Sequence, residues 1–312
     1  MRNYNAESVG ERVAFATLPE SATVKVEASL ARELLDAAER LPRYENREFY
    51  STELQKKLRD ALRVRSDGFG ALVAEIRAAL NRWPYCVLVH GLSFDDGNRV
   101  FVGVNRAFGE LVARPYEAPR AQLVHYIQPA TDIMSTRGGQ ESERLHTDTA
   151  DWEPPVELIS MVCVRADPNG GGRSRVLDVD SIRDEVEHKL GATTLKKLET
   201  EAVPWKLADY CGGGVQWRTI LTERSVCWRR YTIDMALDST GSTLSPEMLS
   251  ALEDFENVIS RTPRTLDFLM REGDLLFSDN RRTIHARTPI SNSQNSDRLM
   301  IRSWIRRGKN GT

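Results

Sequence analysis

Residues 145–166 read LHTDTADWEPPVELISMVCVRA and place a short polar motif directly before an apolar segment. The segment VELISMVCVRA (156–166) has the β-branched residues and the length of a buried strand. His146 and Asp148 are separated by one residue, and on an extended chain residues i and i+2 point to the same side. Both side chains can therefore reach one point, which makes them a candidate pair of ligands for a divalent metal.

Short apolar segments separated by turns continue along the chain after about residue 120. They carry β-branched and aromatic residues at lengths typical of strands. The segments are AQLVHYIQP (121–129), SRVLDVD (174–180), SVCWRRYTIDMA (225–236), GDLLFSDN (273–280) and RLMIRSWIR (298–306). Helices are expected to interrupt them at about 181–201 and at 245–261, where Ser-Pro-Glu is a favourable helix start. The pattern favours an antiparallel barrel or a jelly roll.

The first third of the chain has helical periodicity instead. Apolar residues recur at three- and four-residue spacings in three stretches, at 30–41, 54–62 and 72–80. YCVLVHGL (85–92) is then typical of a buried strand, and NRAFGELVARP (105–115) of a helix that Pro115 ends.

Helices followed by many strands indicate a mainly β fold with helices packed outside the sheet. We expect a single domain over 1–312. Its residues 1–84 form a mostly helical N-terminal part, and residues 85–312 form a jelly-roll core with helical insertions.

The composition is typical of a globular protein in a reducing compartment. Of the 312 residues 40% are hydrophobic and 28% charged, and the net charge of −2 favours neither nucleic acid nor an anionic membrane as a partner. The N-terminal MRNYNAESVGERV lacks the layout of a signal peptide, and the aliphatic runs are too short to span a bilayer. The four cysteines form no CxxC pair, so we expect free thiols and a cytoplasmic protein. The oligomeric state stays open.

Few histidines can complete a metal site, because the chain has only five. His90 lies among apolar strand residues and His188 in the charged helix RDEVEHKL, which disfavours both, and His125 is a reserve candidate. His285 follows a predicted strand and turn in GDLLFSDNRRTIHARTPI (273–290). Two histidines and one carboxylate on a β scaffold form the facial triad of Fe(II) oxygenases. The same set with a bound water would serve zinc in a hydrolase.

Two arginines follow His285 on one predicted strand. Arg298 and Arg302 are four residues apart in DRLMIRSW (297–304) and therefore point to the same face. An arginine that points into a barrel needs an anion, and its planar guanidinium suits a carboxylate. Inward arginines thus indicate carboxylate binding, whereas exposed arginines on an edge strand are the alternative interpretation.

Together these motifs resemble the Fe(II)/2-oxoglutarate-dependent oxygenases of the taurine dioxygenase and clavaminate synthase type. The resemblance covers about residues 91–302. It is carried by LHTDT (145–149), ADPNGGGRSRVLD (166–178), DNRRTIHARTP (279–289) and DRLMIR (297–302). The string DNRR-x-x-H-x-R-x-P followed by R-x-x-x-R is most similar to clavaminate synthase and to the free-amino-acid β-hydroxylases for arginine and asparagine. The resemblance implies a double-stranded β-helix, or jelly-roll, core.

The resemblance also implies roles for individual residues. The iron ligands would be His146, Asp148 and His285. Arg298 would hold the distal carboxylate of 2-oxoglutarate, and Ser174 falls where the family has a hydroxyl that hydrogen-bonds the same carboxylate. Arg302 falls where amino-acid hydroxylases bind the carboxylate of their substrate.

The chain departs from the amino-acid hydroxylases directly after the first two ligands. Those enzymes commonly have Glu where this chain has Asp148, which is usual in the taurine branch, and TADWEP replaces their usual metal loop. Asp151 and Trp152 lie in this altered loop and are candidate substrate-binding residues, with a structural role as the alternative. Residues 131–144 and 205–217 are candidate lids or ordinary surface loops.

The resemblance implies an oxygenase that uses Fe(II), 2-oxoglutarate and O2 and releases succinate and CO2. We expect it to hydroxylate an unactivated C–H bond of a small molecule, most plausibly an amino acid or a derivative in natural-product biosynthesis, free or bound to a carrier protein. Desaturation or cyclisation would use the same residues. A zinc hydrolase and an inactive jelly-roll binding protein are the alternatives from other classes.

Overall fold

A computed structural model describes residues 14–113, 123–128, 142–290 and 297–307. A large sheet forms its centre, with the strand order β1-β2-β10-β5-β12-β3 and β4 paired to the free part of β12. All pairings in it are antiparallel except that of β1 with β2. The strands are β1 (Thr23–Lys25), β2 (Cys86–His90), β3 (Glu110–Val112), β4 (His125–Ile127), β5 (Leu158–Arg165), β10 (Leu275–Asp279) and β12 (Leu299–Arg306).

A smaller antiparallel sheet faces the large one and has the order β11-β6-β9. Its strands are β6 (Ser174–Asp178), β9 (Leu266–Phe268) and β11 (Thr283–Arg287). Strands β7 (Val203–Lys206) and β8 (Val215–Arg218) form a separate hairpin. Two β layers from segments far apart in the sequence are the arrangement of a jelly roll, so the expected fold class is confirmed.

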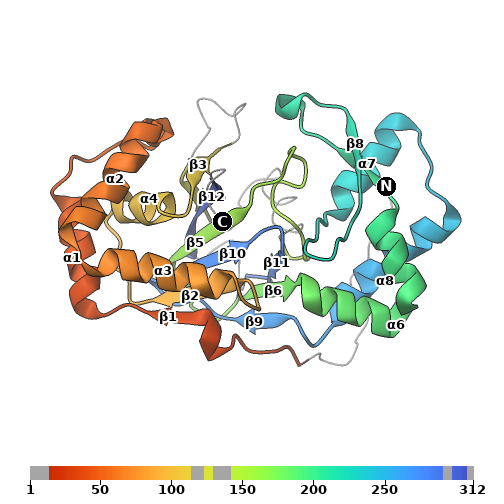
Figure 1. Cartoon of the computed structure of the whole chain (residues 1–312), viewed down its shortest axis with the longest axis horizontal. Coiled ribbons are helices and arrows are strands. Elements are labelled where there is room, and N and C mark those ends of the chain that lie inside the picture. The colour runs from red at the N-terminus through yellow and green to blue at the C-terminus, as the bar shows by residue number, and fades with distance from the viewer. Residues whose placement is uncertain (1–13, 114–122, 129–141, 291–296, 308–312) are drawn as a thin grey trace.

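Helices cover the outer faces of both sheets (Figure 1). One group packs on the large sheet: α1 (Ala28–Glu39), α2 (Thr52–Arg65), α3 (Gly68–Leu80) and α4 (Arg99–Arg106). The other lies beside the small sheet: α6 (Val179–Thr200), α7 (Arg230–Thr240) and α8 (Pro246–Arg261). Short 3-10 helices complete the described part: η1 (Glu20–Ala22), η2 (Asn46–Tyr50) and η4 (Asp209–Cys211). None of the described helices is long and apolar enough to cross a membrane.

The side chains of strand β12 alternate between the two faces of the large sheet. Ile301 and Ile305 pack into the cluster formed with α1 to α4, whereas Met300 belongs to the cluster between the two sheets. Alternation along a strand then places residues 302 and 304 on the inner side, together with Met300. The pairing with β5 shifts between Leu299 and Met300, where β5 has one extra residue. The inner side of β12 therefore carries Arg302 and Trp304, whose side chains can donate hydrogen bonds into the space between the sheets.

Two expected elements are wrong. Residues 225–236 were expected as a strand, but α7 begins at Arg230, where an i,i+4 ion pair with Asp234 (2.8 Å) and buried Ile233 support a helix. Residues 105–115 were expected as a helix, but α4 ends at Arg106 and β3 follows. A Cβ at Gly109 would collide with a backbone oxygen of β12, so the chain runs against that strand and pairs with it.

Candidate metal centre

Three side chains from two distant segments meet between the sheets. The backbones of His146 and His285 form an antiparallel bridge, in which each N–H donates to the other carbonyl at 2.9 Å. Asp148 Oδ1 lies 3.6 Å from His146 Nε2 and 3.9 Å from His285 Nε2. One ligand atom from each residue lies within 4.8 Å of the others, and no other such set of three occurs in the described parts of the chain. The two histidines and the carboxylate are thus brought together.

Asp148 reaches this point from a turn, not from the strand that its spacing suggested. The amide side chain of Asn280, which is fully buried, fixes that turn. Its oxygen accepts the N–H of Asp148 at 3.0 Å, and its nitrogen donates to the carbonyls of Asp148 (3.0 Å) and Val156 (2.9 Å). A side chain from the end of β10 therefore sets the position of the carboxylate ligand.

The surroundings of the two imidazoles suit metal binding through Nε2. His146 Nδ1 donates to the carbonyl oxygen of Arg144 at 2.8 Å, which leaves the lone pair of Nε2 facing Asp148. Burial lowers the pKa of His285 to about 3, helped by the nearby positive charges, so this ring is neutral at physiological pH. The Nε2 atoms of the two rings would be the ligands of a divalent metal.

The two oxygens of Asp148 have different surroundings. Oδ2 accepts hydrogen bonds from Arg302 Nη1 (3.0 Å) and Trp304 Nε1 (2.8 Å), while Oδ1 faces the two histidines. Burial alone would raise the pKa of Asp148, but Arg302 and the histidines outweigh it and hold the pKa well below its ordinary value. The carboxylate is thus ionised, with one oxygen left for a metal. The donor set fits Fe(II).

Arg298 lies behind the metal centre, just before β12, with only 5% of its surface exposed. Its Nη2 donates to the carbonyl of Gly172 at 3.3 Å. Gly172 has φ +64°, and a Cβ there would lie 2.5 Å from Arg298 Nε, so the arginine occupies the space that the missing side chain leaves. Burial lowers the pKa of Arg298, as expected for a guanidinium removed from water.

Ser174 opens β6 on the same inner face as Val176, which pairs with His285. Ser174 and His285 line one small cavity between the sheets, of about 30 Å³, and Met161 and Leu276 form part of its apolar wall. Ser174 and one of the three candidate metal ligands, His285, thus border the same space.

The three expected substrate-binding residues lie around the opposite side of the centre. Arg302 contacts Asp148 as described. Trp152 is buried, packs edge-on against Trp304 (ring centroids 5.5 Å apart) and donates from Nε1 to Tyr210 Oη at 2.5 Å. Asp151 has a buried Oδ1 without a hydrogen-bond partner, while Tyr210 Oη donates to its Oδ2 at 3.5 Å. Their roles towards a substrate stay predictions.

Of the two candidate lids, one is visible as a β-hairpin. Residues 205–217 run through β7, η4 and β8. The loop of this hairpin reaches the turn after the metal ligands, because the N–H of Ala208 donates to the carbonyl of Asp151 at 2.9 Å and Tyr210 contacts Trp152. Of the other candidate, 131–144, residues 131–141 lie outside the described residues. His125, the reserve ligand, is not part of the metal cluster, and its ring packs on Trp304 at 4.6 Å.

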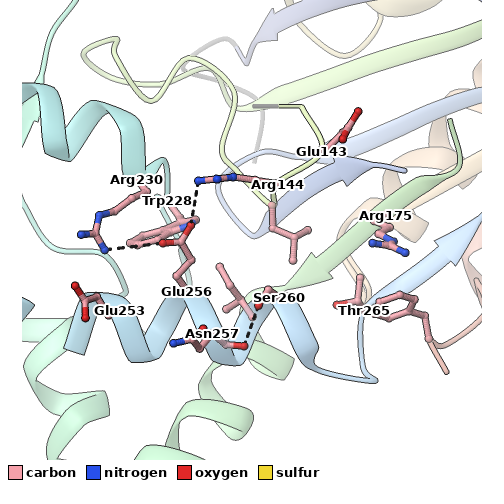
Figure 2. Close-up of a pocket in the computed structure, with 13 residues that line it drawn as sticks. Glu143, Arg144, Arg175, Trp228, Arg230, Glu253, Glu256, Asn257, Ser260 and Thr265 are labelled. Carbon is pink, nitrogen blue, oxygen red and sulfur yellow. Dashed lines mark hydrogen bonds and ion pairs between the residues drawn. The ribbon is translucent and has the colours of Figure 1, made fainter. Parts of the chain in front are cut away.

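A second cavity, of about 550 Å³, lies on the outer side of the small sheet and is separate from the metal centre. Figure 2 shows Arg144 and Arg230 directed towards Glu256 of α8, with nitrogen–oxygen distances of 3.7 and 3.9 Å. None of the three metal-binding side chains lines this cavity. The connection between the two is Arg144, whose carbonyl oxygen orients His146.

A comparison of the chain with sequence profiles of known protein families shows the family to which it belongs. The profile described as "Taurine catabolism dioxygenase TauD, TfdA family" matches residues 66–304. The chain belongs to this family. The match includes all three candidate metal ligands, together with Arg298 and Arg302, and it confirms the resemblance to iron- and 2-oxoglutarate-dependent dioxygenases that the motifs indicated.

Solved structures share the fold of this TauD/TfdA-family chain. An asparagine oxygenase in complex with Fe(II), 2S,3S-3-hydroxyasparagine and succinate has a TM-score of 0.73 at 16% identity, over 91% of this chain and 93% of that chain. The non-heme iron oxygenase OrfP in complex with Fe and alpha-ketoglutaric acid has a TM-score of 0.68 at 14% identity, over 93% and 94%. OrfP with Fe, succinate and (3S)-hydroxy-L-Arg has 0.67 at 14%, over 91% and 93%. A comparison with curated protein sequences finds no match.

Three residues that support the site were not singled out from the sequence: Asn280, Trp304 and Gly172. Asn280 stands inside the motif DNRR, which the resemblance used without giving that position a role. Trp304 shares its parity with Arg302, a signal that could have found it. Gly172 is one of three successive glycines, and only the approach of Arg298 distinguishes it from the others.

Proposed function

We propose that the chain is an Fe(II)- and 2-oxoglutarate-dependent oxygenase that hydroxylates an unactivated C–H bond of an amino acid or an amino-acid derivative. The observation that carries the proposal is the convergence of His146, Asp148 and His285 within 4.8 Å in a buried site. The family match supports the reaction class, and the hydroxylated asparagine and arginine in the titles of similar structures support the substrate class.

The proposed reaction is balanced without a side chain that acts as a base. Iron with 2-oxoglutarate supplies the oxidising chemistry: one O2 is consumed, 2-oxoglutarate becomes succinate and CO2, and the substrate C–H becomes C–OH. The residues of the chain hold the ligands and exclude water. The two imidazoles and the carboxylate would hold the metal on a rigid β scaffold, and this ligand set suits oxygenase chemistry with a cosubstrate and O2.

We assign the end of the cavity near Ser174 to 2-oxoglutarate. Arg298 would pair with its distal carboxylate and the hydroxyl of Ser174 would donate to the same group, so that the buried ion pair has its remaining hydrogen bonds satisfied. The apolar wall of Met161 and Leu276 suits the methylene groups between the two ends of the molecule.

Arg302 then has two tasks in this proposal. Its Nη1 donates to Asp148 at 3.0 Å, and its guanidinium would also bind the carboxylate of the substrate. Asp151 and Trp152 would line the substrate side, where the buried Oδ1 of Asp151 suits a substrate ammonium group. All four cysteines are unpaired thiols, which is consistent with the cytoplasm as the proposed location.

The experiment that tests the function is succinate release in the presence of Fe(II), 2-oxoglutarate and O2. Free amino acids and the same amino acids as thioesters, which imitate carrier-bound substrates, serve as the panel. We expect at least one to stimulate succinate release and to gain one oxygen atom by mass spectrometry. Failure of every compound to stimulate release, with no 2-oxoglutarate bound, would contradict the proposal.

Variants of the two inner arginines separate their tasks. Arg298→Ala should raise the KM for 2-oxoglutarate by about tenfold or more, because a charge-assisted pair is lost. Arg302→Ala should raise the KM for the substrate and weaken Fe(II) binding, while the affinity of the metal-loaded protein for 2-oxoglutarate changes little. The reverse pattern would exchange the two assignments.

A further inference from the structure

Arg229 lies next to the residue that supports the loop between two metal ligands. Thr147 stands between His146 and Asp148, and its N–H donates to the carbonyl of Trp228 at 2.7 Å. The N–H of Trp228 donates in turn to Thr147 Oγ1 at 3.0 Å. Arg229 follows Trp228 in the sequence. The two hydrogen bonds between Trp228 and Thr147 therefore fix the backbone of Arg229 next to the loop that carries His146 and Asp148.

The side chain of Arg229 points to the inner side of the small sheet. Trp228 is buried on the outer side, where its ring contacts Phe255 of α8 at a centroid distance of 4.8 Å. The backbone at Arg229 is extended (φ −159°, ψ 95°), and consecutive side chains of an extended chain point in opposite directions.

The guanidinium of Arg229 has no anionic partner among the described residues. Its Nε is buried and lacks an acceptor. The next residue, Arg230, differs: it pairs with Asp234 at 2.8 Å and approaches Glu256 at 3.9 Å. A partly buried guanidinium without an acceptor is unfavourable, because it loses hydration without compensation. A bound anion would remove that cost.

The charges of the site leave room for one more negative group. We count three arginines (229, 298 and 302) and two carboxylates, Asp148 and Asp151, as the charged side chains of the site, and the contact of Arg302 with Asp148 is direct. Fe(II) and the 2-oxoglutarate dianion add +2 and −2, so the loaded site would have a net charge of +1 before the substrate enters. An ordinary zwitterionic amino acid does not change this sum. An amino acid with an acidic side chain neutralises it.

We propose that Arg229 binds an acidic group of the substrate, so that the substrate is a small amine with two anionic groups, such as an amino acid with a carboxylate side chain. The proposal rests on the oxygenase function proposed above. Arg302 would take the main carboxylate, Asp151 the ammonium group, and Arg229 the remote acid. Recognition at both ends would fix which C–H bond faces the metal.

The test uses matched pairs of acids and amides, which have nearly the same shape. The protein is loaded with Fe(II) and 2-oxoglutarate without oxygen, and L-aspartate, L-asparagine, L-glutamate and L-glutamine are titrated by calorimetry. We expect one of the two acids to bind at least about tenfold more tightly than its amide. Arg229→Gln should remove this preference by weakening the acid, while the amide is little affected.

Two further variants control the experiment. Arg230→Gln removes the same charge from the neighbouring residue, which already has acidic partners, and should keep the preference for the acid. Arg229→Lys retains a positive charge and should keep part of the preference, so loss of folding and loss of charge are distinguished. A thermal unfolding scan of each variant checks that it is folded.

Two outcomes would overturn the assignment. In the first, neither acid binds more tightly than its amide in the wild-type protein. In the second, Arg229→Gln weakens the binding of 2-oxoglutarate instead, which would show that Arg229 binds the cosubstrate and not the substrate. Failure of the oxygenase function itself is recognised earlier, because 2-oxoglutarate would then not bind to the Fe(II)-loaded protein before any amino acid is added.

Discussion

The two oxygens of Asp148 face different partners, and this division defines the site at the scale of single residues. The ligands themselves could be predicted, because His-x-Asp spacing and the scarcity of histidine left few choices. The residues that orient them could not. Asn280 and Trp304 act on Asp148 through contacts across 132 and 156 residues of sequence. The parity of Trp304 with Arg302 predicts a shared strand face, but no local pattern encodes the contact with Asp148.

Gly172 provides the sharpest prediction at this scale. Gly172→Ala should raise the dissociation constant for 2-oxoglutarate by roughly tenfold, because its Cβ would displace Arg298 from the position that meets the cosubstrate. Gly170→Ala is the matched control, since Gly170 also has positive φ (+74°) but open space around a Cβ. Equal effects of the two substitutions would show that backbone strain, not the contact with Arg298, is responsible.

At the scale of elements, the strands that build the site followed from the sequence better than their surroundings. Alternation in RLMIRSWIR correctly placed Arg302 on an inward face, and β5, β6 and β10 lie within the expected apolar segments. The prediction of a strand at 225–236 was wrong, although Trp228 and its neighbours suit a strand. The helix that begins at Arg230 depends on the burial of Ile233 and Ala236 against other elements. Tertiary contacts there decide between two locally acceptable structures.

Tyr85, directly before β2, is hydrogen-bonded to the first turn of α6. Tyr85 Oη donates to Asp180 Oδ2 at 2.6 Å, and this bond, with burial and the charge of Asp180, raises the pKa of Tyr85 from 10.0 to about 12. The folded protein thus holds the phenolic proton more tightly than the unfolded chain. Its contribution to stability is complete below pH 10 and is lost as the pH rises towards 12.

Urea unfolding of the wild type and of Tyr85→Phe across this pH range measures the contribution. The wild type should lose more stability between about pH 10 and about pH 12 than the variant, which has no proton to lose there. Tyr231→Phe, at an exposed position of α7, serves as the control and should behave like the wild type. If the unfolding free energies of the wild type and of Tyr85→Phe changed equally with pH, the raised pKa of Tyr85 would be contradicted.

At the scale of the whole molecule, the two-layered fold explains how residues 146 and 285 come to share a metal. The small sheet supplies His285 from β11, whose backbone bridges to His146, and the large sheet supplies Arg302 and Trp304 from β12. Helices before strands in the sequence predicted this class of fold. The pairing of distant strands was expected only through the resemblance to a family, because periodicity indicates a strand but not its neighbour.

The central claim is that His146, Asp148 and His285 form one metal site to which 2-oxoglutarate binds. The most direct measurement is anaerobic calorimetry of 2-oxoglutarate with and without Fe(II), for the wild type, His285→Ala and the exposed control His188→Ala. We predict binding that requires Fe(II) in the wild type and in His188→Ala, and none in His285→Ala. Binding that is independent of Fe(II), or that survives in His285→Ala, would contradict the account.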